Sequence, residues 1–277
     1  MEYDISKYKD MSPHEIRLRI RRNEFNLPTS GMCLGYAQAN LVILPRRYAV
    51  DFLEYARKNP FPCPVLEVIQ GSPKTHGIAE DGDITTDISE YYVYRDGKRC
   101  EILSDVSQFW QDDSVGFLLG CSFSFEEALL KAGIEIRHLT QKRIVPMFKT
   151  NIATVPAGPF SGPMVCTMRP MTPENAKKAC EITKAYPNVH GAPVNIGEPE
   201  KLGIKDIMHP DWGDGVDIYP GEVPVFWPCG VTPQAAIENA RLPLVITHSP
   251  SHMFITDIKN TELNAYIDRV KADFKVL

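Results

Sequence analysis

Two cysteines occupy equivalent places in an internal repeat, and they are the residues of this sequence best suited to chemistry. The copies run over 115–129, which holds Cys121, and over 223–237, which holds Cys229. Each copy reads as an apolar strand, the cysteine, a Ser or Thr three residues later that can cap a helix, and the helix itself. A helix N-terminus favours an anion and lowers the pKa of a nearby thiol. The repeat therefore predicts two facing loops that bind a small dianion or an amino acid, although any two βαβ units would resemble one another.

Polar side chains next to these loops are candidates for holding a ligand. Serine and threonine hydroxyls at the two helix starts would assist the backbone N–H groups, and asparagine or arginine side chains would orient an amine or a carboxylate. These candidates are Asn40, Ser122, Ser124, Asn151, Arg169 and Thr232. A structural ion pair would also explain Arg169, and turn or backbone bonding would explain the two asparagines.

Acid–base chemistry has five candidates. They are Cys121, Cys229, Glu126, His248 and His252. Glu126 falls in the first turn of a predicted helix, where the helix dipole alone would explain a carboxylate. The two histidines are four residues apart, but Pro250 lies between them and is incompatible with a regular helix. A divalent ion, Mg²⁺ or Mn²⁺, held by this loop with Asp257 or His190 is therefore an open alternative to a single hydrogen-bonded histidine.

Composition narrows the function classes. The 277 residues carry 30 Lys and Arg against 35 Asp and Glu, a net charge of −5, whereas nucleic-acid-binding domains are usually basic. Hydrophobic residues make up 43% and charged residues 23%, which is typical of a globular chain. The charged N-terminal residues lack the apolar core of a signal peptide, and no run approaches the roughly eighteen apolar residues of a membrane span. We therefore expect a cytoplasmic protein without nucleic-acid or membrane partners, whose seven cysteines are reduced.

The hydrophobic pattern predicts the elements that position these residues. Helices are expected after the Ser12 capping box, after Pro45, and at 125–131, 173–185 and 233–240. Strands are expected at 41–44, 65–69, 91–94, 99–103, 115–119, 134–139, 164–168, 192–196, 223–227, 244–247 and 253–256. The alternation predicts an α/β protein with a mixed sheet flanked by helices. Loops at the C-terminal ends of its strands would form the site.

Pro- and Gly-rich segments at 156–163 and 212–221 suggest two joints in the chain. We interpret residues 1–155 and 220–277 as a main α/β domain, and 156–219 as a smaller inserted α+β domain. The first predicted helix carries an arginine cluster from Arg17 to Arg22. A solvated face is the plainer explanation, and binding of an anion or of a partner subunit is the alternative. The chain could therefore form a homo-oligomer.

Several long motifs resemble one known family. They are GYAQANLVILP at 35–45, LGCSFSFEEAL at 119–129, EVPVFWPCGVTPQ at 222–234 and THSPSHMFITD at 247–257, with shorter matches at 160–163, 168–170 and 190–193. These motifs are typical of the hydro-lyase or D-glutamate cyclase family, whose bacterial members are often called YcsI-like. The resemblance runs from Ser12 to Asp257. It departs at Ser251, where the family pattern leads us to expect glycine.

The resemblance implies a two-domain α/β fold, a bacterial cytoplasmic lyase and the loss of water from a small acidic metabolite. The best-defined activity of the family belongs to amino-acid metabolism and interconverts D-glutamate and 5-oxo-D-proline. Lactam formation needs a base for the amine, an acid for the departing hydroxyl and donors for the oxyanion. The alternatives are a hydratase or dehydratase of another small carboxylate, and a non-catalytic protein that binds an acidic metabolite.

Overall fold

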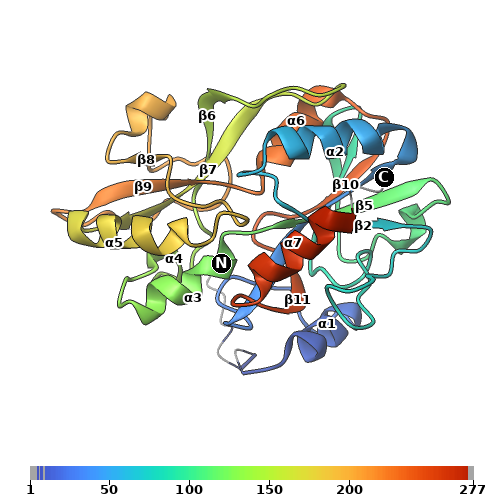
Figure 1. Cartoon of the computed structure of the whole chain (residues 1–277), viewed down its shortest axis with the longest axis horizontal. Coiled ribbons are helices and arrows are strands. Elements are labelled where there is room, and N and C mark those ends of the chain that lie inside the picture. The colour runs from blue at the N-terminus through green and yellow to red at the C-terminus, as the bar shows by residue number, and fades with distance from the viewer. Residues whose placement is uncertain (1–4, 6, 9, 274–277) are drawn as a thin grey trace.

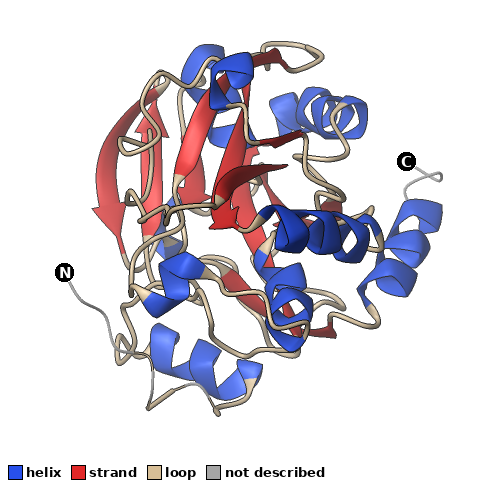
Figure 2. Cartoon of the chain, turned by 90° about the vertical axis from the view of Figure 1, so that its left-hand side faces the viewer, coloured by secondary structure: helices blue, strands red, loops and turns tan. Residues whose placement is uncertain are grey.

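The chain builds two sheets that lie on opposite sides of the molecule, each with helices packed against it (Figure 1). The computed structural model describes residues 5, 7–8 and 10–273, with side chains up to residue 270. Figure 2, turned by 90°, shows the strands crossing the molecule and the helices packed around them. Among the described residues, no helix is long and apolar enough to cross a membrane.

The larger sheet has seven strands around one long apolar strand. Its strands are β1 (Tyr36–Pro45), β2 (Val65–Gln70), β3 (Tyr91–Arg95), β4 (Lys98–Leu103), β5 (Ser114–Gly120), β10 (Val245–His248) and β11 (Phe254–Lys259). The order is β2-β5-β1-β10-β3-β4, and β11 also pairs with β1. Alternate side chains of β1 enter two different cores, Leu41 and Ile43 on one face and Val42 and Leu44 on the other. Covered on both faces, β1 is buried along its length except at its two ends.

The smaller sheet has four strands in the order β6-β7-β9-β8. Their bounds are β6 (Met147–Ala153), β7 (Pro163–Met171), β9 (Val223–Pro228) and β8 (Asn195–Ile196). The sheet therefore draws on residues from both sides of the predicted insert 156–219 as well as from within it. The domain boundaries stay a prediction.

Every strand pairing in the described part of the chain is antiparallel, so the predicted mixed sheet is wrong. The combination of helices and strands is confirmed. When helices and strands alternate along a chain, each helix is expected to connect two adjacent parallel strands of one sheet. In this fold, however, β5 lies in the larger sheet and β9 in the smaller one. The helix after each of them leads the chain from one sheet to the other.

Seven α-helices accompany the sheets in the described residues. They are α1 (Pro13–Arg21), α2 (Ala49–Lys58), α3 (Phe123–Lys131), α4 (Arg137–Thr140), α5 (Pro173–Lys184), α6 (Thr232–Ala240) and α7 (Leu263–Asp273), with 3-10 turns at Arg46–Tyr48, Ser107–Phe109 and Pro199–Leu202. The predicted capping box of α1 is confirmed, because Ser12 Oγ accepts the N–H of Glu15 and the Glu15 carboxylate accepts the N–H of Ser12. The helix predicted after Pro45 is confirmed as α2, and it ends before Asn59-Pro60, because a residue that precedes proline disfavours the helical region.

The strand predicted at 134–139 is wrong. Ile134 and Ile136 insert into a core shared with Phe125 and Leu129 of α3, and Ile136 is the residue before α4 begins. These alternating apolar residues bury the loop that connects α3 to α4. A buried loop of this kind has the same period of two as a half-buried strand, so the sequence pattern does not distinguish the loop from a strand.

The arginines of α1 bond to groups within the chain. Arg17 is 1% exposed and donates to both carboxylate oxygens of Asp257 at 2.8 Å. Arg21 pairs in the same way with the buried Asp87. The predicted solvated face is therefore wrong for Arg17, whose guanidinium exchanges water for a bidentate carboxylate and two backbone carbonyls.

Candidate active site

The two cysteine loops meet in one buried cluster. Cys121 follows β5 and Cys229 follows β9, and both pack with Phe123, Val231 and Met253. Each thiol has a backbone N–H two residues further on. The N–H of Val231 lies 3.5 Å from Cys229 Sγ, and the N–H of Phe123 is hydrogen-bonded to Cys121. The sequence repeat is thus also a repeat in space, of two similar turns against a common core.

Asn40, on β1, connects the two turns. Its Nδ2 donates to the carbonyl of Gly120 at 2.7 Å, directly before Cys121. The same amide packs on Gly230, where a Cβ would overlap it. Glycine is required at 230 because any side chain would displace this amide. Asn40 therefore fixes the spacing between the Cys121 and Cys229 turns.

A buried ion pair lies beside the turns. Arg169 on β7 and Glu126 on α3 are each 1% exposed. Nε and Nη2 of the arginine donate to Glu126 Oε1, the first at 3.1 Å. The guanidinium also donates to the hydroxyls of Ser122 and Thr167, each at 3.1 Å. Within the described residues, Glu126 Oε2 accepts no hydrogen bond. Burial raises the pKa of Glu126, and the charge of Arg169 offsets part of that rise.

His138, on α4, completes the surroundings of the pair. Its Nε2 lies 3.4 Å from Glu126 Oε1 and 3.1 Å from Ser30 Oγ, and its ring stacks on Phe123. Burial lowers the pKa of His138 well below its ordinary value, helped by the charge of Arg169, so the ring is neutral. A proton on Nε2 is favoured, because a bare lone pair there would face the carboxylate.

Both thiols keep their protons at neutral pH, so the expected lowering of their pKa is wrong. Burial raises the pKa of Cys229 to about 11, and raises that of Cys121 further above its ordinary value. The N–H groups and Arg169 act in the opposite direction in both cases. The cost of removing a thiolate from water exceeds these local attractions. The turns therefore present proton donors rather than thiolate nucleophiles.

The hydroxyls at the helix starts do not cap them as predicted. The N-caps of α3 and α6 are Ser122 and Val231, and neither makes a side-chain cap bond. Thr232 Oγ1 instead donates to the carbonyl of Cys229 at 2.7 Å and accepts an N–H from β7 at 3.0 Å, which joins this turn to the smaller sheet. Ser124 Oγ is buried and has no partner among the described residues.

The His248–His252 loop forms a second group of polar side chains. His248 Nδ1 accepts the N–H of Leu41 at 3.1 Å, which leaves the proton on Nε2, an atom with no partner in the described part of the chain. His252 Nδ1 lies 2.9 Å from Ser89 Oγ. Ser251 has φ +69°, in the left-handed region that favours glycine, and its buried hydroxyl is unpartnered among the described residues. The departure from the family pattern thus falls on a strained position.

The residues considered for a divalent ion do not fit one. Asp257 is bonded to Arg17, and His190 Nδ1 lies 2.6 Å from the carbonyl oxygen of Phe61. Across the described residues, no three His, Cys, Asp or Glu side chains are grouped so that they could hold a metal ion. We therefore derive no step through a metal, and the metal requirement stays a prediction.

Most of the predicted site residues lie at or beside the two turns. That group is Cys121, Cys229, Glu126, Asn40, Ser122, Ser124, Arg169 and Thr232. The histidine loop adjoins the Cys229 side, because Gln234 of α6 donates to the carbonyl of His248 at 2.9 Å. Asn151 lies apart, exposed on β6 and bonded to the carbonyl of Lys201.

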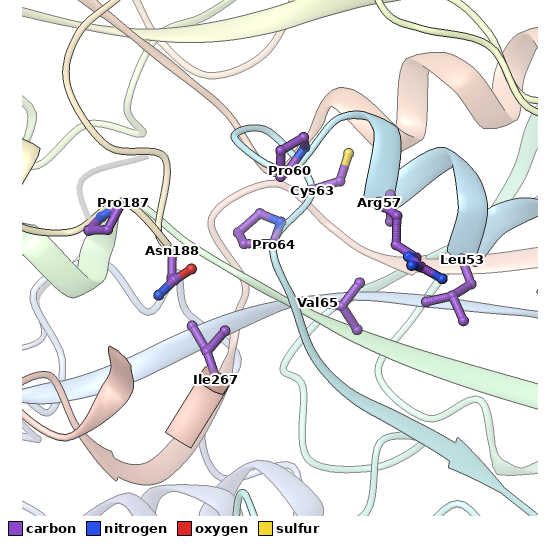
Figure 3. Close-up of a pocket in the computed structure, with 10 residues that line it drawn as sticks. Leu53, Arg57, Pro60, Cys63, Pro64, Val65, Pro187, Asn188 and Ile267 are labelled. Atoms are coloured by element: carbon purple, nitrogen blue, oxygen red, sulfur yellow. The ribbon is translucent and has the colours of Figure 1, made fainter. Parts of the chain in front are cut away.

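Two cavities border the residues that precede the cysteines. One of about 320 Å³ has apolar walls from α2 and α7, and Asn188 faces Pro64 across it (Figure 3). Pro64 also packs on Gly120, where a Cβ would lie 3.1 Å from its ring. The other cavity, of about 380 Å³, is lined by His190 and Pro228 among others. Cys121, Cys229, Glu126 and Arg169 themselves are buried and are not among the residues that line these two cavities.

His138 is absent from the site residues that the sequence predicts, and His190 enters only as a metal alternative. The repeat holds a signal for His138, which ends the segment after the first repeat helix as His248 does after the second. Its contact with Ser30 joins residues 108 positions apart. No local pattern reveals such a pairing.

The chain closely resembles proteins already grouped into a family. The D-glutamate cyclase family model matches residues 115–257, which hold both cysteine turns and Arg169. A crystal structure of a nitrogen repressor-like protein from Methanococcus jannaschii matches 88% of this chain and 97% of its own at 10% identity. Its TM-score of 0.34 is too low to inform the fold.

Relatives with much higher identity cover nearly the whole chain. A "Putative hydro-lyase" of Clostridium beijerinckii is 53% identical over 257 residues, 92% of this chain and 98% of its own length. "Putative hydro-lyase YcsI" of Bacillus subtilis is 51% identical over 254 residues, 91% of this chain and 99% of its own. The chain therefore belongs to the hydro-lyase or D-glutamate cyclase family, the group of YcsI-like proteins.

Proposed function

We propose that this protein interconverts D-glutamate and 5-oxo-D-proline, with loss of water in the direction of the lactam. The observation that carries the proposal is the buried Arg169–Glu126 pair beside two protonated thiols. A fixed cation, a carboxylate of raised pKa and nearby proton donors are the groups that lactam formation needs. The family and the names of the relatives support a reaction that removes water.

Glu126 is the base in this proposal. Burial raises the pKa of Glu126, which makes its carboxylate a stronger base than an exposed one. Oε1 stays on the guanidinium of Arg169, while Oε2 is free to take a proton from the substrate amine. The amine then attacks the γ-carboxyl carbon of the same molecule, and the site contributes chiefly by holding the two ends together.

Arg169 and the two turns receive the charges of the substrate. A substrate carboxylate can replace the hydroxyls of Ser122 and Thr167 on the guanidinium, which are its neutral partners. The N–H groups of Phe123 and Val231, at the starts of α3 and α6, are suited to the oxyanion that forms on attack.

The thiols supply the proton for the departing hydroxyl. Cys229, with a pKa of about 11, holds its proton at neutral pH and is still a stronger acid than water. When the C–N bond has formed, the second proton of the original ammonium passes from nitrogen to a carboxylate oxygen. The C–O bond to that hydroxyl then breaks, and the hydroxyl leaves as water with the thiol proton. The proton on Glu126 then restores the thiol, so that water is the sole by-product.

The test is an NMR time course with D-glutamate, L-glutamate and 5-oxo-D-proline, each run with chelator and with Mg²⁺ or Mn²⁺. We expect lactam and D-glutamate to interconvert, and Glu126→Gln to lower turnover by about 100-fold or more. Glu127→Gln is the matched control, because the neighbouring Glu127 pairs with the exposed Lys131 instead. A Cys229→Ser protein with full activity would remove the thiol from the mechanism.

The outcomes separate this proposal from its alternatives. No lactam and no glutamate formed in either direction, with or without metal, would overturn it. Hydration of an unsaturated acid would point to a hydratase, and tight binding without product would point to a binding protein. Activity that appears only with added metal would establish the divalent requirement.

A further inference from the structure

His190 presents an acceptor nitrogen that no described group of the protein uses. Its Nδ1 lies 2.6 Å from the carbonyl oxygen of Phe61. A carbonyl only accepts, so Nδ1 carries the proton and Nε2 has a lone pair. The residue is 1% exposed, and within the described part of the chain Nε2 has no partner. A buried acceptor without a donor is costly, which makes this atom a candidate for ligand binding.

The histidine lines a cavity whose wall also includes the residue before Cys229. It lines the cavity of about 380 Å³, together with Thr154, Met164 and Pro228. Pro228 directly precedes Cys229. A Cβ at Gly120 would lie 3.5 Å from Val189, so the chain before His190 packs on the start of the Cys121 turn. The charge of Arg169 also reaches the ring and adds to the effect of burial, which lowers the pKa of His190 to about 4.

We propose that Nε2 of His190 accepts a hydrogen bond from the N–H group of the ligand, and that the cavity beside it admits a small carboxylate that bears an amine or a lactam N–H. This inference rests on the proposed function and adds how the substrate nitrogen is recognised. A neutral imidazole with its proton fixed on Nδ1 cannot donate from Nε2. It therefore selects a ligand with a donor at that point over an isosteric ligand with an oxygen there.

Two substitutions distinguish the role of Nδ1 of His190 from that of Nε2. His190→Asn keeps an N–H that can reach the Phe61 carbonyl but has no atom at the Nε2 position. Asparagine also tolerates the φ of +70° at this residue. His190→Gln places an acceptor near the Nε2 position instead. The matched control is His209→Asn, because His209 is exposed and contacts Asp206 on the surface.

The test compares binding of 5-oxo-D-proline with binding of its lactone analogue, in which a ring oxygen replaces the N–H. Dissociation constants are measured by calorimetry for the wild-type protein and the three variants, with thermal unfolding as the check on folding. We expect the wild type and His209→Asn to prefer the lactam by at least tenfold. His190→Asn should bind both ligands within about twofold of each other, and His190→Gln should regain part of the preference.

A measurement on the wild type alone keeps the test decisive if a variant does not fold. Long-range ¹H–¹⁵N spectra should identify Nε2 of His190 as unprotonated, with a shift that changes on adding the lactam and not the lactone. Equal affinity of the wild type for the two ligands, binding of neither, or an unmoved Nε2 resonance would each overturn the inference. Turnover of D-glutamate is scored separately, so lactam preference without turnover would count against the proposed reaction alone.

Discussion

Glu126 and Arg169 depend on each other for their stability inside the protein. Both are buried, so removing one partner leaves a charge without compensation, at a cost of about 3–5 kcal/mol. Removing both charges together avoids that cost. We therefore expect Arg169→Met and Glu126→Leu each to lower the free energy of unfolding by about 3 kcal/mol or more. The double variant should lose much less than the sum of the two.

Urea unfolding of the two single variants and the double variant measures this coupling. The pair Lys149–Glu238 is a suitable control, because its atoms are 3.1 Å apart but its side chains are 39% and 34% exposed. There we expect single losses below about 1 kcal/mol and little coupling. Additive losses at 126 and 169 would contradict an essential ion pair.

His138 tunes the base if its Nε2–H faces Glu126 as the geometry indicates. His138→Phe keeps an aromatic ring against Phe123 and removes that N–H. Without the N–H dipole the carboxylate is less stable, so the pKa of Glu126 should rise further. A base is active only when ionised, so the acid limb of kcat/KM should move to higher pH. An unmoved limb with lowered kcat would assign His138 to packing instead.

At the scale of elements, the sequence pattern predicts what is local and fails where contacts are distant. The strand–turn–helix units around Cys121 and Cys229 are found almost at their predicted bounds, because each follows from nearby apolar residues and a helix start. Whether strands run parallel or antiparallel depends instead on which strands are neighbours in a sheet. β5 and β9 belong to different sheets, and nothing within either segment encodes that.

The loop after β10 contains strain that a single substitution can release. Ser251 has φ +69°, a conformation that costs a side chain about 1–2 kcal/mol, and its carbonyl is held there by the N–H of Thr29 at 2.8 Å. Glycine relieves this cost but loses about 0.5–1 kcal/mol of chain entropy. We therefore expect Ser251→Gly to be more stable than Ser251→Ala by about 0.5–1 kcal/mol.

Thermal and urea unfolding of the two variants measure the difference. Both substitutions delete the unpartnered hydroxyl, so the difference in stability between them measures the cost of the positive φ at position 251. Equal stability would mean that the loop relaxes out of the left-handed region. Unchanged turnover in both variants would show that the serine at this position has no part in the reaction.

Across the whole molecule, the candidate site exists because two sheets meet. Glu126 comes from the helix that leaves the larger sheet, and Arg169 from the second strand of the smaller one. Their residue types make both of them candidates in the sequence, and both fall within the family motifs. Their pairing across 43 positions, like that of Ser30 with His138, depends on how the sheets pack. That packing is a property of the complete fold.

Buried histidines make the stability of the whole molecule depend on pH. Burial lowers the pKa of His190 and His248 to about 4, and that of His138 well below its ordinary value. In the unfolded chain these rings take up protons as the pH falls below about 6.5, while the folded chain keeps them neutral. The stability they contribute is therefore complete above pH 6.5 and is lost as the pH falls toward 4.

We expect the free energy of unfolding to fall between pH 7 and pH 4.5, with His190 and His248 each contributing up to about 3 kcal/mol. His248→Asn isolates one ring, because an amide oxygen can still accept the N–H of Leu41 but does not titrate. Its unfolding free energy, measured in urea at half-unit steps of pH, should fall less steeply than that of the wild type. His209→Asn should follow the wild type, since that ring is exposed. A His248→Asn profile parallel to the wild type would mean that His248 takes up its second proton over the same pH range in the folded and unfolded chains, with the new Nδ1–H directed at the Leu41 carbonyl.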